Sequence, residues 1–281
     1  MIKNQEGKRI NTISYLGWGI IHEKRGIPCQ DYIHYSYADN GNYIMALSDG
    51  ATSARYAKEA AQVTVESVIN FFSGHSLKEF LTCGRTEQKE AILDHILNAL
   101  ITCAKQVHCF DYRELSATLL FLIYDGKNLV TCHLGDGAIF LANSRNDIVF
   151  VSEPDHMNGY TNRTFFTVSR EAAEHMRIDW FDLAETGIIR ALMMSDGAYL
   201  MFYNRGNRNA LSTAKELLSY TKDGLISNDD DLCNVLNQMA EVPSERLDDW
   251  SVLIFDADQK RYESALEIVS MLSQENEKNT R

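Results

Sequence analysis

The pattern of apolar and polar positions predicts an early β-hairpin. Apolar and aromatic residues fill 32–37 and 43–47, and Asp39-Asn40-Gly41-Asn42 stands between them. An Asn-Gly pair tolerates the positive φ angles of tight hairpin turns. A hairpin of this length brings its two outer ends together, so we expect Asp31 and Asp49 to lie side by side. Upstream, residues 13–21 are expected to form another strand, followed by a polar connection over 22–31.

Apolar residues at helical spacing predict four helices further along the chain. The first two cover about 54–72 and 86–107, with Thr86 as a candidate N-cap of the second. The other two cover about 212–220 and 230–240. We expect their apolar stripes to face the core, because most amphipathic helices of folded domains only pack.

Short β-rich segments, separated by turn residues, occupy the middle of the chain. They cover 117–124, 129–134, 138–142 and 148–151, and their spacing predicts an antiparallel meander. Two more apolar strands are expected over 188–194 and 251–255. Residues 152–183 are polar and weakly periodic apart from a helix-like stretch over 170–176, so we expect a surface flap there.

The end of the chain, about 263–281, begins as an amphipathic helix and continues as a charged tail. No composition shift marks an internal linker, and no repeat of solenoid period is present. We therefore expect one domain over residues 1–281, with the flap and the tail as its appendages.

Composition narrows the classes of function. With 281 residues, 45% hydrophobic, 23% charged and three prolines, the chain is typical of a folded soluble protein. A net charge of -12 argues against nucleic acid as a partner. The sequence has no apolar run near the roughly 20 residues that cross a bilayer and no apolar signal region at its start, so we expect no membrane partner and a cytoplasmic protein. The six cysteines form no Cys-x-x-Cys pair, which argues against structural zinc and redox dithiols.

Aspartates stand at the junctions of several apolar strands with loops. Ser48-Asp49-Gly50-Ala51 follows one strand, and Ser195-Asp196-Gly197-Ala198 has the same layout far downstream. The full set is Asp31, Asp49, Asp136, Asp196 and Asp248. Each Asp-Gly pair alone is weak evidence, because both residues are common in turns. Five aspartates at strand ends, three of them in Asp-Gly pairs, are stronger evidence, since such ends can share one edge in an antiparallel sandwich.

Clustered carboxylates repel one another unless a cation neutralises them or some are protonated. Oxygen ligands of this kind suit Mg²⁺ or Mn²⁺, and the absence of a His or Cys cluster argues against zinc. Two such ions can polarise a phosphoryl oxygen and activate a water for phosphate-ester hydrolysis. The sequence therefore favours a divalent metal centre that acts on phosphate esters.

Five motifs together resemble a known family. They are Gly19 to Asp31 (Gly-x-x-His-x-x-x-Gly-x-Pro-Cys-Gln-Asp), Ser48-Asp49-Gly50-Ala51, Gly135-Asp136-Gly137-Ala138, Ser195-Asp196-Gly197 and Asp248-Asp249-Trp250-Ser251-Val252. In order and rough spacing they resemble the metal-dependent protein phosphatases of the 2C type, above all the bacterial branch. The resemblance implies an α+β fold, a four-layer αββα sandwich of two antiparallel β-sheets flanked by helices.

The resemblance also implies roles for individual residues. Asp49 would bridge two metal ions and Gly50 would give its carbonyl oxygen to the second. Asp196 and Asp248 would complete the first metal site, with Asp248 preferred over its neighbour because the family's ligand stands three residues before the Ser or Thr of the last strand. Two further roles follow. Asp31 would bind a metal directly or through water, and Asp136 would hold a looser third ion together with Asp196.

Two departures from the family pattern stand out. The arginine that grips the phosphate in well-known members, five residues before the first aspartate, is Gly26 here, and Arg25 is one residue off. His22 is an alternative phosphate contact, with Arg25 as helper, although a loop histidine is more often simply solvated. The histidine that follows Asp-Gly in animal members is Ala51, so His22 or a metal-bound water would have to deliver the proton to the leaving oxygen.

These features predict a phosphatase that hydrolyses phosphoserine and phosphothreonine in proteins with a metal-activated water at a binuclear Mg²⁺ or Mn²⁺ centre. Its expected partners are phosphorylated proteins and a Ser/Thr kinase system. One alternative is a weak or inactive pseudophosphatase that serves as a signalling or binding module. Another is a structural cation-binding protein, which fits less well because calcium sites usually concentrate their ligands in one short loop.

Overall fold

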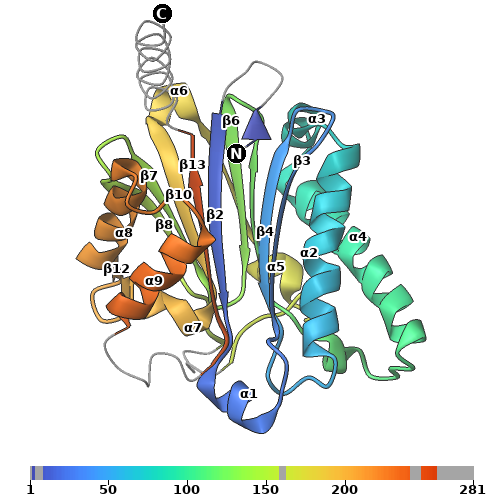
Figure 1. Ribbon diagram of the computed structural model, residues 1–281. Coiled ribbons are helices and arrows are strands. Elements are labelled where there is room, and N and C mark those ends of the chain that lie inside the picture. Colours follow the sequence, from blue (N-terminus) through green and yellow to red (C-terminus); the bar gives the residue numbers. More distant parts are fainter. Residues whose placement is uncertain (1, 4–8, 158–162, 241–247, 258–281) are drawn as a thin grey trace, which may run out of the picture.

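The computed structural model describes residues 2–3, 9–157, 163–240 and 248–257, and its centre is a pair of antiparallel sheets packed face to face (Figure 1). The five-stranded sheet has the order β3 (Asp31–Tyr37), β4 (Tyr43–Asp49), β5 (Leu119–Tyr124), β6 (Asn128–Leu134) and β9 (Arg177–Asp182). The six-stranded sheet has the order β1 (Ile2–Lys3), β2 (Arg9–Gly17), β13 (Trp250–Asp256), β10 (Ile188–Met194), β7 (Ala138–Asn143) and β8 (Ile148–Ser152). The expected sandwich of two antiparallel sheets flanked by helices is confirmed.

Side-chain alternation along the strands builds three apolar layers. In β4, Met45 and Leu47 point between the two sheets, whereas Ile44 and Ala46 point to the outer helices. The inner layer is completed from the second sheet by residues such as Met193 and Leu253. All of these side chains are fully buried. Period-two patterning therefore gives each central strand two apolar faces, as expected for a sheet covered on both sides.

Helices cover the outer face of each sheet (Figure 1). On the five-stranded sheet lie α2 (Ala57–Gly74) and α4 (Arg85–Gln106), with α3 (Leu77–Thr82) between them in sequence. On the six-stranded sheet lie α8 (Ser212–Asp223) and α9 (Asp229–Met239). Short elements complete the described chain: η1 (Tyr112–Leu115), α5 (Ala172–His175), α6 (Leu183–Thr186), α7 (Asp196–Tyr199) and the hairpin β11 (Tyr203–Asn204) and β12 (Asn209–Ala210). The four long helices expected from the sequence are confirmed.

The segment after the first strand differs from the expectation. β2 ends at Gly17, and residues 20–25 form the helix α1 (Ile20–Arg25) instead of a strand end and a polar connection. Gly26 ends this helix in the left-handed conformation, at a φ of 66°. A side chain at Gly19 could not fit, because its Cβ would lie 2.3 Å from the backbone carbon of Asp248. The chain therefore leaves the sheet where another backbone passes close by.

The expected single meander is wrong, because its four strands are divided between the two sheets. β5 and β6 pair in one sheet, and β7 and β8 pair in the other. The crossing runs through Gly135-Asp136-Gly137, where Gly135 has a φ of 125°. A turn signal alone does not distinguish a hairpin from a crossing between sheets.

Two smaller expectations also need correction. The N-cap of α4 is Gly84, whose N–H donates to the Glu87 carboxylate at 3.0 Å, so Thr86 lies inside the helix. The expected flap contains an edge strand, β9, whose charged residues and half-exposed Trp180 hid the strand pattern. The helix-like stretch in the flap is confirmed as α5. The predicted helix and tail over 263–281 lie outside the described residues.

Candidate metal centre

The predicted hairpin places two aspartates opposite each other at the end of the five-stranded sheet. β3 and β4 pair in the register that makes Asp31 and Asp49 Cα partners, which confirms the expected juxtaposition. The backbone N–H of Asp49 donates to Thr118 Oγ1 at 3.0 Å, and the N–H of Thr118 donates back to the Asp49 carbonyl at 2.8 Å. Asp49 is therefore fixed from both neighbouring strands.

Four of the five predicted aspartates line one cavity of about 490 Å³. They are Asp49, Asp136, Asp196 and Asp248. Asp49 is the last residue of β4 in one sheet, and Asp248 shortly precedes β13 in the other. Asp136 lies on the crossing between the two sheets, and Asp196 is the first residue of α7. The other lining residues are Ala51, Thr52, Ser53, Thr118, Thr164 and Phe166, so no basic side chain of the described residues lines the cavity. The distant Asp-Gly motifs do converge on one place.

Asp31 lies behind this cavity and does not line it. Its side chain is buried, and Oδ2 accepts hydrogen bonds from Ser195 Oγ at 2.8 Å and from Ser251 Oγ at 2.5 Å. No donor among the described residues reaches Oδ1. Burial raises the pKa of Asp31 to about 7, with a further contribution from the charges of Asp196 and Asp249 included in this value and the two serine hydrogen bonds acting against it.

The carboxyl groups that line the cavity also have raised pKa values. Burial and then the charge of Asp248 raise the pKa of Asp196 to about 6. The pKa values of Asp49 and Asp136 lie well above the usual 3.8, because of burial first and the neighbouring carboxylates next. Without a cation, these groups therefore resist simultaneous ionisation.

Asp248 and Asp249 have different surroundings. Asp249 is buried, and its oxygens accept from the N–H of Gly19 at 2.8 Å, the N–H of Gln30 at 2.7 Å and His22 Nδ1 at 2.8 Å. The Asp248 side chain is 47% exposed and lines the cavity. His22, Asp248 and Asp249 also come close enough to hold a cation. However, the oxygens of Asp249 already accept hydrogen bonds from three protein donors. We therefore interpret His22 and Asp249 as a hydrogen-bonded pair that supports Asp248, and not as metal ligands.

His22 and Arg25 do not line the cavity. His22 is 2% exposed in α1, where a solvated loop residue was the simpler expectation, and its Nε2 lies 3.7 Å from Asp248 Oδ1. Arg25 is exposed at the end of the same helix. Ala51 lines the cavity with a methyl group, so this position has no proton to give.

The glycines after the aspartates have a packing role that the sequence did not reveal. A Cβ on Gly50 would lie 2.2 Å from the carbonyl oxygen of Ala57, the first residue of α2. A Cβ on Gly197 would lie 2.1 Å from the carbonyl oxygen of Asp249. Carbon and oxygen atoms that are not bonded to each other do not come this close, so a larger residue would force the segments apart. Glycine at both positions therefore allows the acidic loops to lie close together.

Sequence reasoning missed several residues of the site. Thr118 carries no acidic signal, and Phe166 lies in a stretch without clear periodicity. Arg205, in the turn between β11 and β12, is close enough for its charge to lower the pKa values of Asp136 and Asp196 against the dominant effect of burial. Only the three-dimensional fold places this arginine near the carboxylates.

Comparisons with known proteins agree with this geometry. The sequence model of the family described as protein phosphatase 2C matches residues 18–246. No curated protein matches the chain. Among solved structures, the catalytic domain of the serine threonine protein phosphatase PstP in complex with two manganese ions is similar, with a TM-score of 0.60 at 13% identity over 88% of this chain and 97% of that one.

Two further structures have the same fold. The serine/threonine phosphatase Stp1 from Staphylococcus aureus has a TM-score of 0.59 at 11% identity, over 91% of this chain and 97% of that one. PstP/Ppp from Mycobacterium tuberculosis has a TM-score of 0.58 at 15% identity, over 88% and 98%. None of the helices among the described residues has the length and apolarity to cross a membrane. The chain belongs to the protein phosphatase 2C family of metal-dependent protein phosphatases.

Proposed function

We propose that this protein hydrolyses phosphoserine and phosphothreonine in proteins at a divalent metal centre built on Asp49, Asp196 and Asp248. The single observation that carries the proposal is the convergence of four aspartates on one cavity that no basic side chain of the described part of the chain lines. Their pKa values, raised first by burial and then by the neighbouring carboxylates, support it, because a bound cation would stabilise the charged forms.

The residues present fit hard cations. Asp196 Oδ1, in the cavity wall, and Asp31 Oδ1, just behind it, are buried oxygens without a hydrogen-bond donor among the described residues. Carboxylate and carbonyl oxygens are the ligands that Mg²⁺ and Mn²⁺ prefer. We propose two ions, held by Asp49, Gly50, Asp196 and Asp248 with Asp31 as a direct or water-mediated ligand. A third would be held by Asp136 and Asp196.

Divalent cations bound there would supply a water nucleophile at neutral pH and neutralise charge on the phosphoryl oxygens. The chain's own residues hold the ligands in place. Ser195 and Ser251 orient Asp31, and Thr118 fixes the Asp49 backbone. Asp249 joins Gly19, Gln30 and His22 next to Asp248. Its position favours His22 as a residue that positions Asp248, and proton delivery or phosphate contact by His22 or Arg25 stays a prediction.

The substrates that we propose are proteins phosphorylated by a Ser/Thr kinase. A first test is hydrolysis of p-nitrophenyl phosphate with added Mn²⁺ or Mg²⁺, compared between the wild type and Asp49→Ala. Asp94→Ala is the matched control, because Asp94 is exposed on α4 outside the cavity. We expect turnover that needs the cation and is lost only in Asp49→Ala. A folded wild type as inert as Asp49→Ala would contradict the enzyme and support a non-catalytic binding module.

A further inference from the structure

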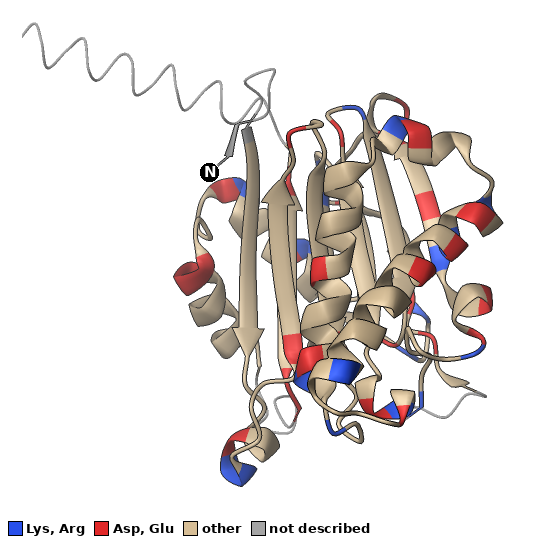
Figure 2. Cartoon of the chain, turned by 90° about the vertical axis from the view of Figure 1, so that its right-hand side faces the viewer, with Lys and Arg blue, Asp and Glu red and all other residues tan. Residues whose placement is uncertain are grey.

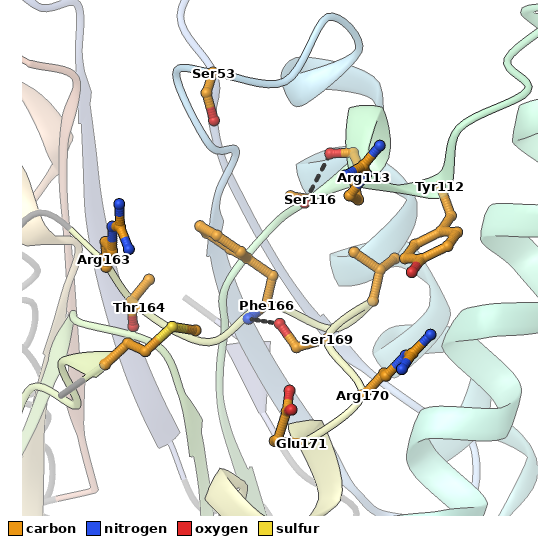
Figure 3. Close-up of a pocket in the computed structure, with 12 residues that line it drawn as sticks. Ser53, Tyr112, Arg113, Ser116, Arg163, Thr164, Phe166, Ser169, Arg170 and Glu171 are labelled. Carbon is orange, nitrogen blue, oxygen red and sulfur yellow. Dashed lines mark hydrogen bonds between the residues drawn. The ribbon is translucent and has the colours of Figure 1, made fainter.

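A second cavity, of about 560 Å³, adjoins the carboxylate cavity. The two share Ser53, Thr164 and Phe166, so they have a common wall. The second cavity lies between the η1 segment, with Tyr112 and Arg113, and the flap residues around Phe166 (Figure 3). A molecule bound at the carboxylates would therefore lie next to this space.

The two adjoining cavities have opposite charge. Among the residues that the structure describes, four aspartates line the first cavity, whereas Arg113, Arg163 and Arg170 line the second together with a single acidic residue, Glu171. We call the second one the arginine cavity. Its excess of positive charge is local, because the chain has a net charge of -12 and acidic residues recur over the helices and strand ends of the face in Figure 2.

The backbone around the arginine cavity is held by hydrogen bonds. The N–H of Phe166 donates to Ser169 Oγ at 2.9 Å, and Thr164 Oγ1 donates to the Asp155 carbonyl at 2.6 Å. The N–H of Thr167 donates to the Ala117 carbonyl at 2.9 Å, which ties the flap to the segment before β5. The wall that carries Arg163 and Arg170 is thus attached to the same sheet as Asp49.

The three arginines are not equivalent. Asp111 holds Arg113 from the side, with Arg113 Nη2 2.6 Å from Asp111 Oδ2 and Nε 3.0 Å from Asp111 Oδ1. Asp111 therefore offsets part of the charge of Arg113. Arg163 and Arg170 are exposed on the flap side of the cavity, so they add positive charge on the side opposite to Arg113.

We propose that the arginine cavity binds an anionic side chain of the phosphoprotein substrate, close in sequence to the phosphorylated residue. The proposal rests on the proposed function, since it assumes that the phosphorylated residue occupies the carboxylate cavity. An extended peptide advances about 3.3 Å per residue, so a side chain a few positions from the phosphorylated residue can reach the adjoining cavity. Guanidinium groups bind carboxylate and phosphate oxygens with paired hydrogen bonds. Phe166 and the half-exposed Tyr112 offer apolar surface to the peptide between them.

The first experiment measures binding without turnover. Fluorescein-labelled peptides with an unphosphorylated central serine carry Glu, Ala or Lys at two and three positions on either side. Anisotropy titrations then give their Kd values. We expect the Glu peptide to bind about tenfold more tightly than the Ala peptide, and the Lys peptide to bind most weakly. Equal Kd values for the three peptides would overturn the proposal.

Variants assign the preference to the cavity. The double variant Arg163→Ala and Arg170→Ala is expected to bring the ratio of the Glu and Ala Kd values close to one. Arg145→Ala is the matched control, because Arg145 is exposed in the turn between β7 and β8, at the strand end opposite to Asp136. Charge reversal, Arg170→Glu, is expected to shift the preference towards the Lys peptide, which loss of folding would not do. An unchanged Glu preference in both flap variants would overturn the proposal.

The second experiment uses the matching phosphoserine peptides and measures kcat/KM with Mn²⁺. We expect kcat/KM to follow the same order as the binding affinities. A peptide with a second phosphoserine in place of Glu is also tested. If it is hydrolysed as well as the Glu peptide or better, the anion site is supported and phosphate is identified as an anion that it binds. Hydrolysis without any preference overturns the arginine cavity as a substrate site but leaves the proposed function intact. Selective binding without hydrolysis contradicts the proposed function and leaves the anion site standing.

Discussion

Asp31 and Asp49 are Cα partners across the β3–β4 hairpin, but only Asp49 lines the carboxylate cavity. Asp31 is buried behind it and held by Ser195 and Ser251. The two carboxylates therefore have different relations to a bound cation. Asp49 can coordinate the cation directly from the cavity wall. Asp31 would coordinate it from the buried side of that wall or through a water molecule.

This difference predicts unequal effects on metal binding. A ligand at a hundredfold excess over its Kd stabilises the folded state by about 2.7 kcal/mol. We expect Asp49→Ala to lose most of the Mn²⁺-dependent rise in melting temperature and Asp31→Asn to keep part of it. Differential scanning fluorimetry over a range of Mn²⁺ concentrations measures both. Equal loss in the two variants would contradict the different placement of the two residues.

The raised carboxyl pKa values predict how the metal-free protein responds to pH. The pKa of Asp31 is about 7 and that of Asp196 about 6 in the folded state, compared with 3.8 ordinarily. The folded state therefore binds more protons than the unfolded state in this window, so stability falls as pH rises from 3.8 through about 7. Urea unfolding in a chelator at a series of pH values measures this.

Added Mn²⁺ provides the control for the pH prediction, because the cation takes over the role of the protons. We expect the decline in stability to flatten or reverse when Mn²⁺ is present at pH 7. Asp31→Asn should weaken the metal-free decline. A metal-free protein whose stability rises steadily from pH 4 to 7 would show that the carboxyl pKa values are not raised.

His22 is expected to act through Asp248. Its removal in His22→Ala takes away a hydrogen bond to Asp249 Oδ2 and a neighbour of Asp248. Residues that orient metal ligands typically contribute 10- to 100-fold in affinity. We expect about tenfold weaker Mn²⁺ binding, measured by calorimetry, with kcat largely restored at saturating Mn²⁺. A kcat that stays low at saturating Mn²⁺, together with a lost limb of the pH profile, would instead assign proton transfer to His22.

Close backbone approach makes Gly197 sensitive to substitution. The Cβ of Gly197→Ala would meet the Asp249 carbonyl oxygen at 2.1 Å, so the loops that carry Asp196 and Asp248 must separate. We expect a loss of about 1–3 kcal/mol in the free energy of unfolding, as for other overpacked sites, together with weaker metal binding. Gly74→Ala is the control, because no described atom outside its chain neighbours and its own helix backbone lies within 4 Å of the added Cβ. Chemical denaturation of both variants decides the comparison.

The sequence predicted the parts of this molecule that depend on local pattern. The hairpin turn at Asn40-Gly41 set the register that pairs Asp31 with Asp49, and period-two alternation marked the strands of the core. The long helices followed from their apolar spacing. The acidic strand ends were visible as residues, and their order matched a family pattern.

What depends on long-range approach was not predictable from the sequence. The crossing at Gly135-Asp136-Gly137 looks like a turn, and its role depends on the packing of two sheets. The burial of His22 follows from α1 lying against Asp249, which is more than 200 positions away. The arginine cavity combines η1 with the flap, and neither segment has a periodic pattern that indicates a site.

The most direct test of the metal centre is anomalous diffraction from a crystal soaked with Mn²⁺. We expect anomalous peaks between Asp49, Asp196 and Asp248, and none of comparable height in a crystal of Asp49→Ala prepared in the same way. A wild-type cavity without anomalous density, or density centred on His22 and Asp249 instead, would contradict the proposed centre.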